Sequence, residues 1–174
     1  MEISSIIYGL LILLACLSPF FIIALIKSNK TNKEIKDFVN HGYKYSIELT
    51  DVDKWPNHFI GMDPLKKKIL YIEKYGDQYE EILLDLNDYK SCEMIRKDVG
   101  SGQNSSIDRI QLNFMSKKSG STTLVFYDSE KNSAMYFELG LGKKWCDFVN
   151  DTIKGKVPQQ TDFNQMKKLK LKLT

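Results

Sequence analysis

The first 26 residues constrain this chain most strongly, because residues 3–26 contain no charged side chain. A helix over that run would be about 36 Å long at ~1.5 Å per residue, which exceeds the ~30 Å hydrocarbon core of a bilayer. A secretory signal peptide has a basic start and a shorter apolar stretch that ends in small residues, and this segment has neither. We therefore predict a transmembrane helix over residues 1–26, in which Pro19 is tolerated as a kink.

A second interpretation of the same segment begins at Cys16. The letters LLAC over residues 13–16 are similar to a bacterial lipobox, in which the cysteine is lipidated and becomes the new N-terminus. A mature lipoprotein normally continues with polar residues, whereas here Leu17 and residues 20–23 continue the apolar run. The pattern favours a retained helix, and lipidation of Cys16 stays open as the alternative.

The flanks of the apolar run predict its orientation. Four lysines follow the run closely and no Lys or Arg precedes it: Lys27, Lys30, Lys33 and Lys36. The positive-inside rule then places the rest of the chain in the cytoplasm, anchored to the inner (cytoplasmic) membrane by a single pass. The three cysteines agree with a reducing compartment, because their number is odd and their spacing does not suit a metal site.

Residues 27–42 are expected to form a juxtamembrane helical stalk. Three apolar side chains fall at helical spacing in this segment: Ile35, Phe38 and Val39. Gly42 follows them and has the character of a helix C-cap. The stalk would connect the membrane segment to the rest of the chain.

The body of the chain, residues 43–155, reads as one mainly β domain. Alternating apolar residues predict a strand over residues 45–49, turns over residues 50–57 and a hairpin over residues 58–75. The clearest alternation, IDRIQLNFM, covers residues 107–115, and a last strand is expected over residues 133–140. About seven strands are expected in all.

After Gly142 the apolar period changes from two to 3.6 residues, which predicts a C-terminal helix over residues 143–154. Its apolar stripe is expected to form the structural core of the helix: Trp145, Phe148, Val149 and Ile153. Gly140 and Gly142 are interpreted as the turn that leads into this helix. Residues 156–174 form a basic tail.

Seven short strands followed by one amphipathic helix with an early tryptophan resemble the pleckstrin-homology-like (PH-like) domains. The resemblance covers residues 58–155, and the opening GMD…KKILYI looks like bacterial membrane-anchored members whose function is uncharacterised. It implies a bent barrel of about seven strands, closed at one end by the helix, with Trp145 at the position of the family's helix tryptophan. A lipocalin-like barrel and an open sheet capped by a helix remain alternatives.

Candidate chemistry in the sequence is sparse. His41 and His58, with Asp51 and Asp53 between them, could build a metal or acid/base site, but their spacing lacks a ligand pattern and favours solvated linker residues. The ELGLGKKW segment, residues 138–145, resembles a phosphate loop only in its glycines. We expect no catalytic residue, no metal and no cofactor.

The cysteines and the overall charge exclude two further classes of function. Cys92 and Cys146 fall in a predicted strand and a predicted helix, where buried cysteine is more often inert packing than a thiolate. A net charge of +3 is too small to argue for nucleic acid.

Clusters of lysine are the remaining functional signal. In the family, basic residues on the loop between the first two strands contact phosphorylated lipid headgroups, and the resemblance places Lys66, Lys67 and Lys68 on that loop. The family's further basic residues along the second strand are missing here. The tail contributes four more lysines as candidates for anionic lipid contact: Lys167, Lys168, Lys170 and Lys172.

These observations predict a membrane-tethered cytoplasmic interaction or adaptor module without catalytic activity. Tethering to a membrane raises the effective concentration of a partner, so weak binding of a protein at a sheet edge would suffice. The alternative is a domain that binds a small ligand or an anionic lipid headgroup. The expected partners are the membrane and a protein whose identity the sequence does not specify.

Overall fold

The computed structural model describes residues 13, 17–18, 28–76, 78–100, 105–131, 134–135 and 137–156. The chain divides into two compact units, Met1–Tyr45 and Ser46–Thr174. The predicted membrane span lies outside the described residues except for three of its positions, and the predicted tail lies outside them except for Lys156. Among the described residues no helix combines the length and the apolar character needed to cross a bilayer.

In the first unit, residues 28–42 are helical and continue into a short 3-10 helix, η1, at Tyr43–Tyr45. His41 belongs to this helical segment, and its ring centroid lies 6.0 Å from that of Tyr45.

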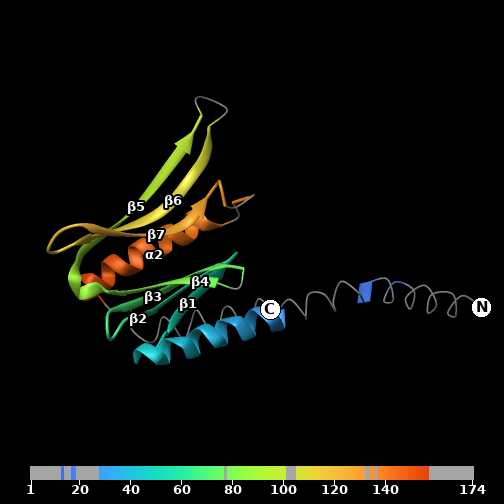
Figure 1. Ribbon diagram of the computed structural model, residues 1–174, viewed down its shortest axis with the longest axis horizontal. Coiled ribbons are helices and arrows are strands. Elements are labelled where there is room, and N and C mark those ends of the chain that lie inside the picture. The colour runs from blue at the N-terminus through green and yellow to red at the C-terminus, as the bar shows by residue number, and fades with distance from the viewer. Residues whose placement is uncertain are drawn as a thin grey trace, which may run out of the picture. The chain divides into compact units, whose positions relative to one another are not determined.

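The second unit contains two antiparallel sheets and one long helix (Figure 1). The first sheet has the order β1-β2-β3-β4, and its strands are β1 (Asp51–Trp55), β2 (His58–Asp63), β3 (Lys68–Tyr75) and β4 (Gln78–Asp85). The second has the order β5-β6-β7, with β5 (Tyr89–Val99), β6 (Ser106–Ser116) and β7 (Ser121–Asp128). The helix α2 covers Glu138–Ile153.

The seven strands do not close into the barrel that the resemblance implied. They form separate sheets of four and three strands among the described residues. A short 3-10 helix, η2 (Leu86–Asp88), lies between β4 and β5, where the Asp85 carboxylate accepts the backbone N–H of Asn87 at 3.0 Å. The chain leaves the first sheet at this turn, and β5 pairs with β6 alone.

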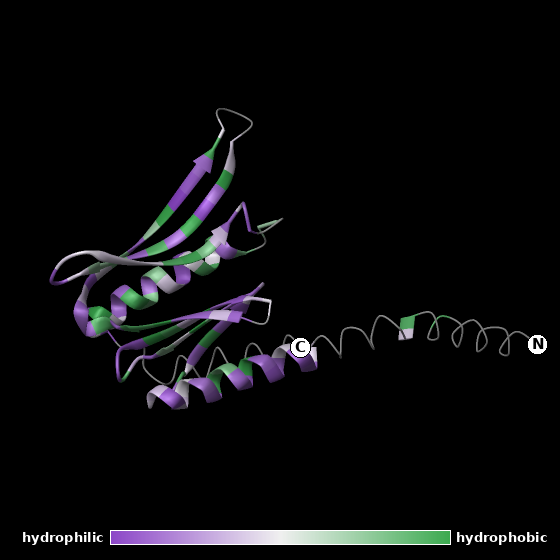
Figure 2. Ribbon diagram, viewed as in Figure 1, coloured by the Kyte–Doolittle hydropathy of each residue, from purple (hydrophilic) through white to green (hydrophobic). Residues whose placement is uncertain are grey.

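The hydrophobic core lies between the two sheets and α2. Its most buried members include Tyr71 from β3, Phe114 from β6, and Trp145 and Val149 from α2. Figure 2 shows apolar and polar residues alternating along β5 and β6, as expected for strands with one buried face. Phe148 and Ile153 are partly buried and pack against this core.

Polar contacts from α2 reach both sheets. The indole N–H of Trp145 donates to the Asp53 carboxylate of β1 at 2.9 Å, and Lys144 forms an ion pair with the same carboxylate at 2.5 Å. On the other sheet, the side-chain amide of Asn150 accepts the Cys92 N–H at 2.9 Å and donates to the Cys92 carbonyl at 2.8 Å. One helix therefore connects β1 with β5.

Several predicted elements were wrong. Residues 45–49 form no strand, and β1 lies in the segment interpreted as turns, because pairing with β2 outweighs the low strand propensity of its two aspartates. The segment 133–140 contains no strand in its described part, and α2 begins at Glu138, five residues before the predicted start. The Glu138 carboxylate accepts the N–H of Phe137 at 2.8 Å, which satisfies a backbone donor at this end of the helix.

Gly140 and Gly142 therefore lie inside the helix and do not form a turn before it. A Cβ atom at Gly142 would lie 3.2 Å from Met94 Sδ and 3.3 Å from Ile110 Cγ2, whereas a Cβ at Gly140 would meet nothing within 4 Å. Gly142 lets the helix approach the second sheet closely.

Candidate functional site

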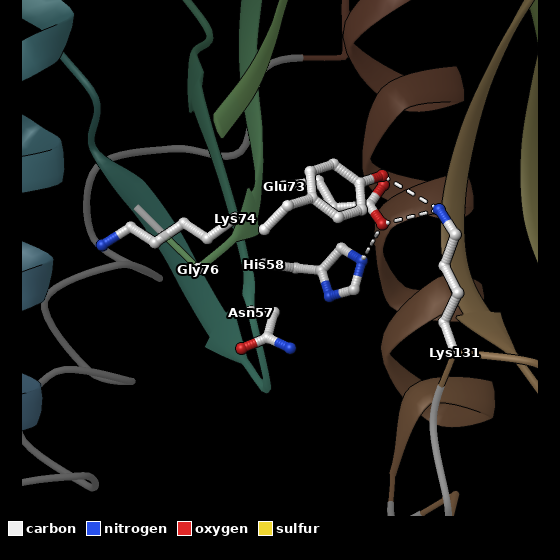
Figure 3. A pocket seen from close by; sticks show the side chains of 7 residues that line it. Asn57, His58, Glu73, Lys74, Gly76 and Lys131 are labelled. Atoms are coloured by element: carbon white, nitrogen blue, oxygen red, sulfur yellow. Dashed lines mark hydrogen bonds and ion pairs between the residues drawn. The ribbon is translucent and has the colours of Figure 1, made fainter. Parts of the chain in front are cut away.

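The main candidate site is a polar hollow at one end of the β2–β3 hairpin (Figure 3). His58 opens β2 and is paired across the ladder with Glu73, near the end of β3. Lys131 reaches the same place from the turn after β7. The hollow has a volume of about 320 Å³ and is lined by Asn57, His58, Glu73, Lys74, Tyr75, Gly76 and Lys131.

A two-residue loop, Pro56 and Asn57, joins β1 to β2 and sets the position of His58. Asn57 has a φ of 64°, a left-handed conformation that asparagine tolerates better than most residues. The imidazole of His58 then stacks on Trp55, with ring centroids 5.0 Å apart and planes 4° from parallel. Only 3% of His58 is exposed, so its interpretation as a solvated linker residue was wrong.

The hydrogen bond of His58 identifies its tautomer. Nδ1 lies 2.6 Å from the carbonyl oxygen of Pro56, and because a carbonyl only accepts, Nδ1 carries the proton. Burial lowers the pKa of His58, although the bond to Pro56 and the charge of Glu73 oppose this effect. The neutral ring therefore presents the lone pair of Nε2, which lies 3.6 Å from Glu73 Oε1.

Glu73 is an ionised carboxylate with a buried side chain, 8% exposed. Burial by itself would raise its pKa, but hydrogen bonds with Tyr75 and Lys131 and the nearby charges outweigh burial and lower the pKa overall. The ammonium of Lys131 lies 3.1 Å from Glu73 Oε1 and 2.9 Å from the Tyr75 hydroxyl. These hydrogen bonds raise the pKa of Lys131, so its charge is retained.

Tyr71 lies beneath the carboxylate and links the two sheets. Its hydroxyl donates to the carbonyl of Val125 on β7 at 2.6 Å. The same hydroxyl is 3.5 Å from Glu73 Oε2, and since it has a single hydrogen, the shorter contact is the hydrogen bond. Burial, followed by the charge of Glu73, raises the pKa of Tyr71.

The turn that carries Lys131 is held by Asp128. The Asp128 carboxylate accepts the N–H of Glu130 at 3.1 Å and pairs with Arg109 on β6 at 2.8 Å. The backbone N–H of Lys131 donates to the Asp128 carbonyl at 3.1 Å. The cation in the hollow therefore comes from the second sheet, while its carboxylate partner comes from the first.

The arrangement suits binding better than acid/base catalysis. In a base oriented by a carboxylate, the carboxylate accepts an N–H of the imidazole and leaves the other nitrogen free. Here the N–H is bonded to Pro56, and the basic nitrogen of His58 faces Glu73. No serine, threonine or cysteine lines the hollow, and the described part of the chain contains no group of three His, Cys, Asp or Glu side chains suited to a metal ion.

The acid/base or metal cluster considered from the sequence is not assembled. Asp51 and Asp53 both pair with Lys144 of α2, at 3.5 and 2.5 Å, and Asp53 also accepts from Trp145. His58 lies instead beside Glu73, its neighbour across the β2–β3 ladder. Lys144, at the end of the glycine-rich ELGLGKKW segment, is therefore engaged in an ion pair between helix and sheet.

The lysines of the predicted lipid-binding loop lie at the opposite end of the β2–β3 hairpin from the hollow. The two ends are five ladder positions apart, or about 17 Å at ~3.4 Å per residue. This loop joins the second and third strands, because β1 precedes both of them. The prediction that it lies between the first two strands of the domain was therefore wrong. Lys66 donates its backbone N–H to Asp63 at 2.9 Å and its ammonium to the carbonyl of Ser46.

Lys67 and Lys68 are half-buried, and Leu65 beside them is 85% exposed. The four tail lysines, Lys167, Lys168, Lys170 and Lys172, lie outside the described residues. Three of the seven predicted lipid contacts, consecutive in the sequence, thus lie at this end of the hairpin, Lys66 and Lys67 in the turn and Lys68 at the start of β3.

Sequence reasoning missed Glu73, Tyr75 and Lys131. A signal for Glu73 was present: it shares the inward-facing positions of β3 with Ile69 and Tyr71, where an acidic residue requires a partner. Nothing local pointed to Lys131, which is 58 residues away in the sequence.

Comparison with known proteins returned no relative of this chain. No family model matches it, and neither a curated protein nor a solved structure matches it significantly.

Proposed function

We propose that this chain is a membrane-tethered, cytoplasmic interaction module without catalytic activity, and that the hollow is where its body contacts a partner. The observation that carries the proposal is the content of the hollow. It combines a neutral imidazole, a carboxylate, a phenol and an ammonium, in which the ammonium bonds to the carboxylate and the phenol, and no serine, threonine or cysteine lines it. Such a set can recognise polar and charged groups of a partner.

The tether is part of the same proposal. The uncharged run over residues 3–26 is long enough to span a bilayer, and the four lysines after it favour a cytoplasmic body. At the inner membrane the module would meet its partner in two dimensions, so that a small hollow could contribute useful affinity. Protease added outside intact cells should leave the C-terminal body uncut; its digestion would reverse the orientation.

The fold is compatible with a PH-like assignment, which belongs to this proposal. Antiparallel sheets of four and three strands are followed by a helix that carries Trp145 in the core. This arrangement supports a PH-like domain in its open, two-sheet form.

Photo-crosslinking in intact membranes tests the proposal. A crosslinking amino acid at Asn57, an exposed residue on the rim of the hollow, should capture a reproducible protein partner. The matched control carries the same group at Lys118, an exposed residue of the β6–β7 turn, and a second control keeps only residues 1–42. Recovery of nothing above both controls would reject the interaction module.

One observation favours the alternative, contact with an anionic lipid headgroup. Leu65 is 85% exposed and stands beside Lys66 and Lys67 on the β2–β3 turn, so an apolar side chain and two cations share one tip. Residues 43–174 should then bind anionic liposomes, and less so at high salt. Changing Lys66, Lys67 and Lys68 to Glu should abolish binding, whereas the same change at Lys117 and Lys118 should not; equal effects would reject a specific lipid site.

A further inference from the structure

The ammonium of Lys131 is held by a set of acceptors that belongs to another part of the fold. Its Nζ lies 3.1 Å from Glu73 Oε1, 2.9 Å from the Tyr75 hydroxyl and 4.8 Å from the centroid of the Tyr75 ring. The Glu73 side chain is 8% exposed, whereas that of Lys131 is 47% exposed. The acceptor is therefore built into a strand, and the cation reaches it from solvent.

The tautomer of His58 makes the acceptor set incomplete without a cation. Nε2 of His58 and Oε1 of Glu73 are both hydrogen-bond acceptors in this state, and they lie 3.6 Å apart without a hydrogen between them. Figure 3 shows both groups turned toward Lys131. A primary ammonium has three N–H groups and one positive charge, which suits two acceptors and a carboxylate at one place.

The space beside the ion pair can take more than the lysine that occupies it. The hollow has a volume of about 320 Å³, at the small end of ligand sites, which run from roughly 300 to 1,000 Å³. Lys74 points away from the ion pair (Figure 3), and its ammonium lies 4.9 Å from the ring centroid of Phe59. The hollow therefore holds one carboxylate and one inward-facing cation.

We infer that Glu73, Tyr75 and His58 form a receptor for a primary ammonium group, that Lys131 occupies it within the chain, and that a lysine side chain of the partner displaces Lys131. The inference rests on the proposed interaction function and specifies its recognition chemistry. The exchange keeps one cation on the buried carboxylate throughout, so the large cost of an unpaired buried charge is avoided. The displaced Lys131 is already half in solvent and returns to water.

Chemical rescue of Lys131→Ala tests the receptor in the full chain in detergent. The variant should have a lower melting temperature than the wild type, because Glu73 loses its cation. n-Butylammonium chloride should restore most of that loss in a saturable manner, whereas sodium chloride and tetramethylammonium chloride, which has no N–H, should not. Lys118→Ala, on an exposed turn, should show neither the loss nor the rescue.

A second arm distinguishes a free amine from a polypeptide lysine. A short capped peptide with one lysine should stabilise Lys131→Ala, and the same peptide with an acetylated lysine should not. If Lys131→Ala does not fold, Lys131→Met keeps an apolar stem and takes its place in both arms. The double variant with Glu73→Gln should lose the rescue.

Two results would overturn the inference: no amine-selective rescue in either variant, or equal rescue by tetramethylammonium. Lys131 would then be only a clamp between the sheets. That failure is separate from failure of the interaction function, because crosslinking at Asn57 would still recover a partner. Conversely, rescue without any crosslinked partner would keep the ammonium receptor and reject both the protein interaction and the displacement of Lys131 by a partner's lysine.

Discussion

Two glycines of α2 allow the packing of this helix on the second sheet to be tested by mutation. The same Gly→Ala change can be made at an exposed and at a buried position, so that the effect of helix propensity is the same in both variants. Gly140 is exposed, and a Cβ there would meet nothing within 4 Å. Gly142 is buried, and a Cβ there would lie 3.2 Å from Met94 Sδ and 3.3 Å from Ile110 Cγ2. Both positions lie in the first turns of the same helix, so Gly→Ala raises helix propensity similarly at each.

The two substitutions are expected to change the free energy of unfolding in opposite directions. Gly140→Ala should stabilise the folded state by roughly 0.5–1 kcal/mol, which is the ordinary gain of alanine over glycine in a helix. Gly142→Ala has the same gain, but an added methyl in a filled core costs about 1–3 kcal/mol. Met94 can shift its flexible end, whereas Ile110 is fully buried and branched, so the cost should exceed the gain.

Thermal unfolding of the full chain in detergent, followed by circular dichroism, measures the difference. We expect Gly140→Ala to melt above the wild type and Gly142→Ala to melt below it. A separation of about 1–3 kcal/mol corresponds to roughly 4–12 °C for a body of this size. Equal upward shifts in both variants would refute the close approach of α2 to β6, and no upward shift at Gly140 would refute the early start of the helix.

Three further predictions follow from the described contacts. Asn150→Ala should cost about 1–3 kcal/mol of unfolding free energy in the same melting assay, because the Cys92 N–H loses its side-chain acceptor and the Cys92 carbonyl keeps only the weak Cys146 thiol donor; an effect below about 0.5 kcal/mol would contradict the paired contact. Stability should fall as pH drops below 6.5, since burial lowers the pKa of His58 and the unfolded chain then binds more protons than the folded one. Stability should fall further below pH 4.5, because the pKa of Glu73 is lowered in the folded state and its protonation then favours unfolding. In a plot of melting temperature against pH, His58→Gln should remove only the decrease between pH 6.5 and pH 4.5. Cys92 and Cys146 should react slowly with iodoacetamide at pH 7.5 until the chain is unfolded, because burial raises the pKa of each thiol; rapid labelling by mass spectrometry in the folded state would disprove this.

The spacing of apolar residues correctly predicted the strands and the helix that bury one face, such as β6 and α2. The alternation over residues 107–115 lies within β6, and Trp145 and Val149 are fully buried on α2. The early start of α2 was missed because Gly140 and Gly142 suggested a turn. The stripe in fact begins at Leu141, which is four residues before Trp145 and buried.

The hollow could not be derived in the same way. Its carboxylate and its cation are 58 residues apart, and they meet because the two sheets share one core, across which Tyr71 of β3 and Trp55 of β1 both donate to carbonyls of β7. The sequence therefore placed the candidate basic site on the lysine-rich turn, where the charges are adjacent in the chain. A buried acid and its partner are matched in space, and local sequence carries no record of that match.

By itself, the sequence determined a long uncharged N-terminal run with lysines after it, a mainly β body and a C-terminal helix, because these follow from hydrophobic period and local charge. The tertiary structure alone decided that the strands divide into sheets of four and three and that His58, Glu73, Tyr75 and Lys131 share one hollow. The physical reason is the range of the interactions. Periodicity reflects which face of a segment is buried, whereas strand pairing and the neutralisation of a buried charge depend on groups far apart in the chain.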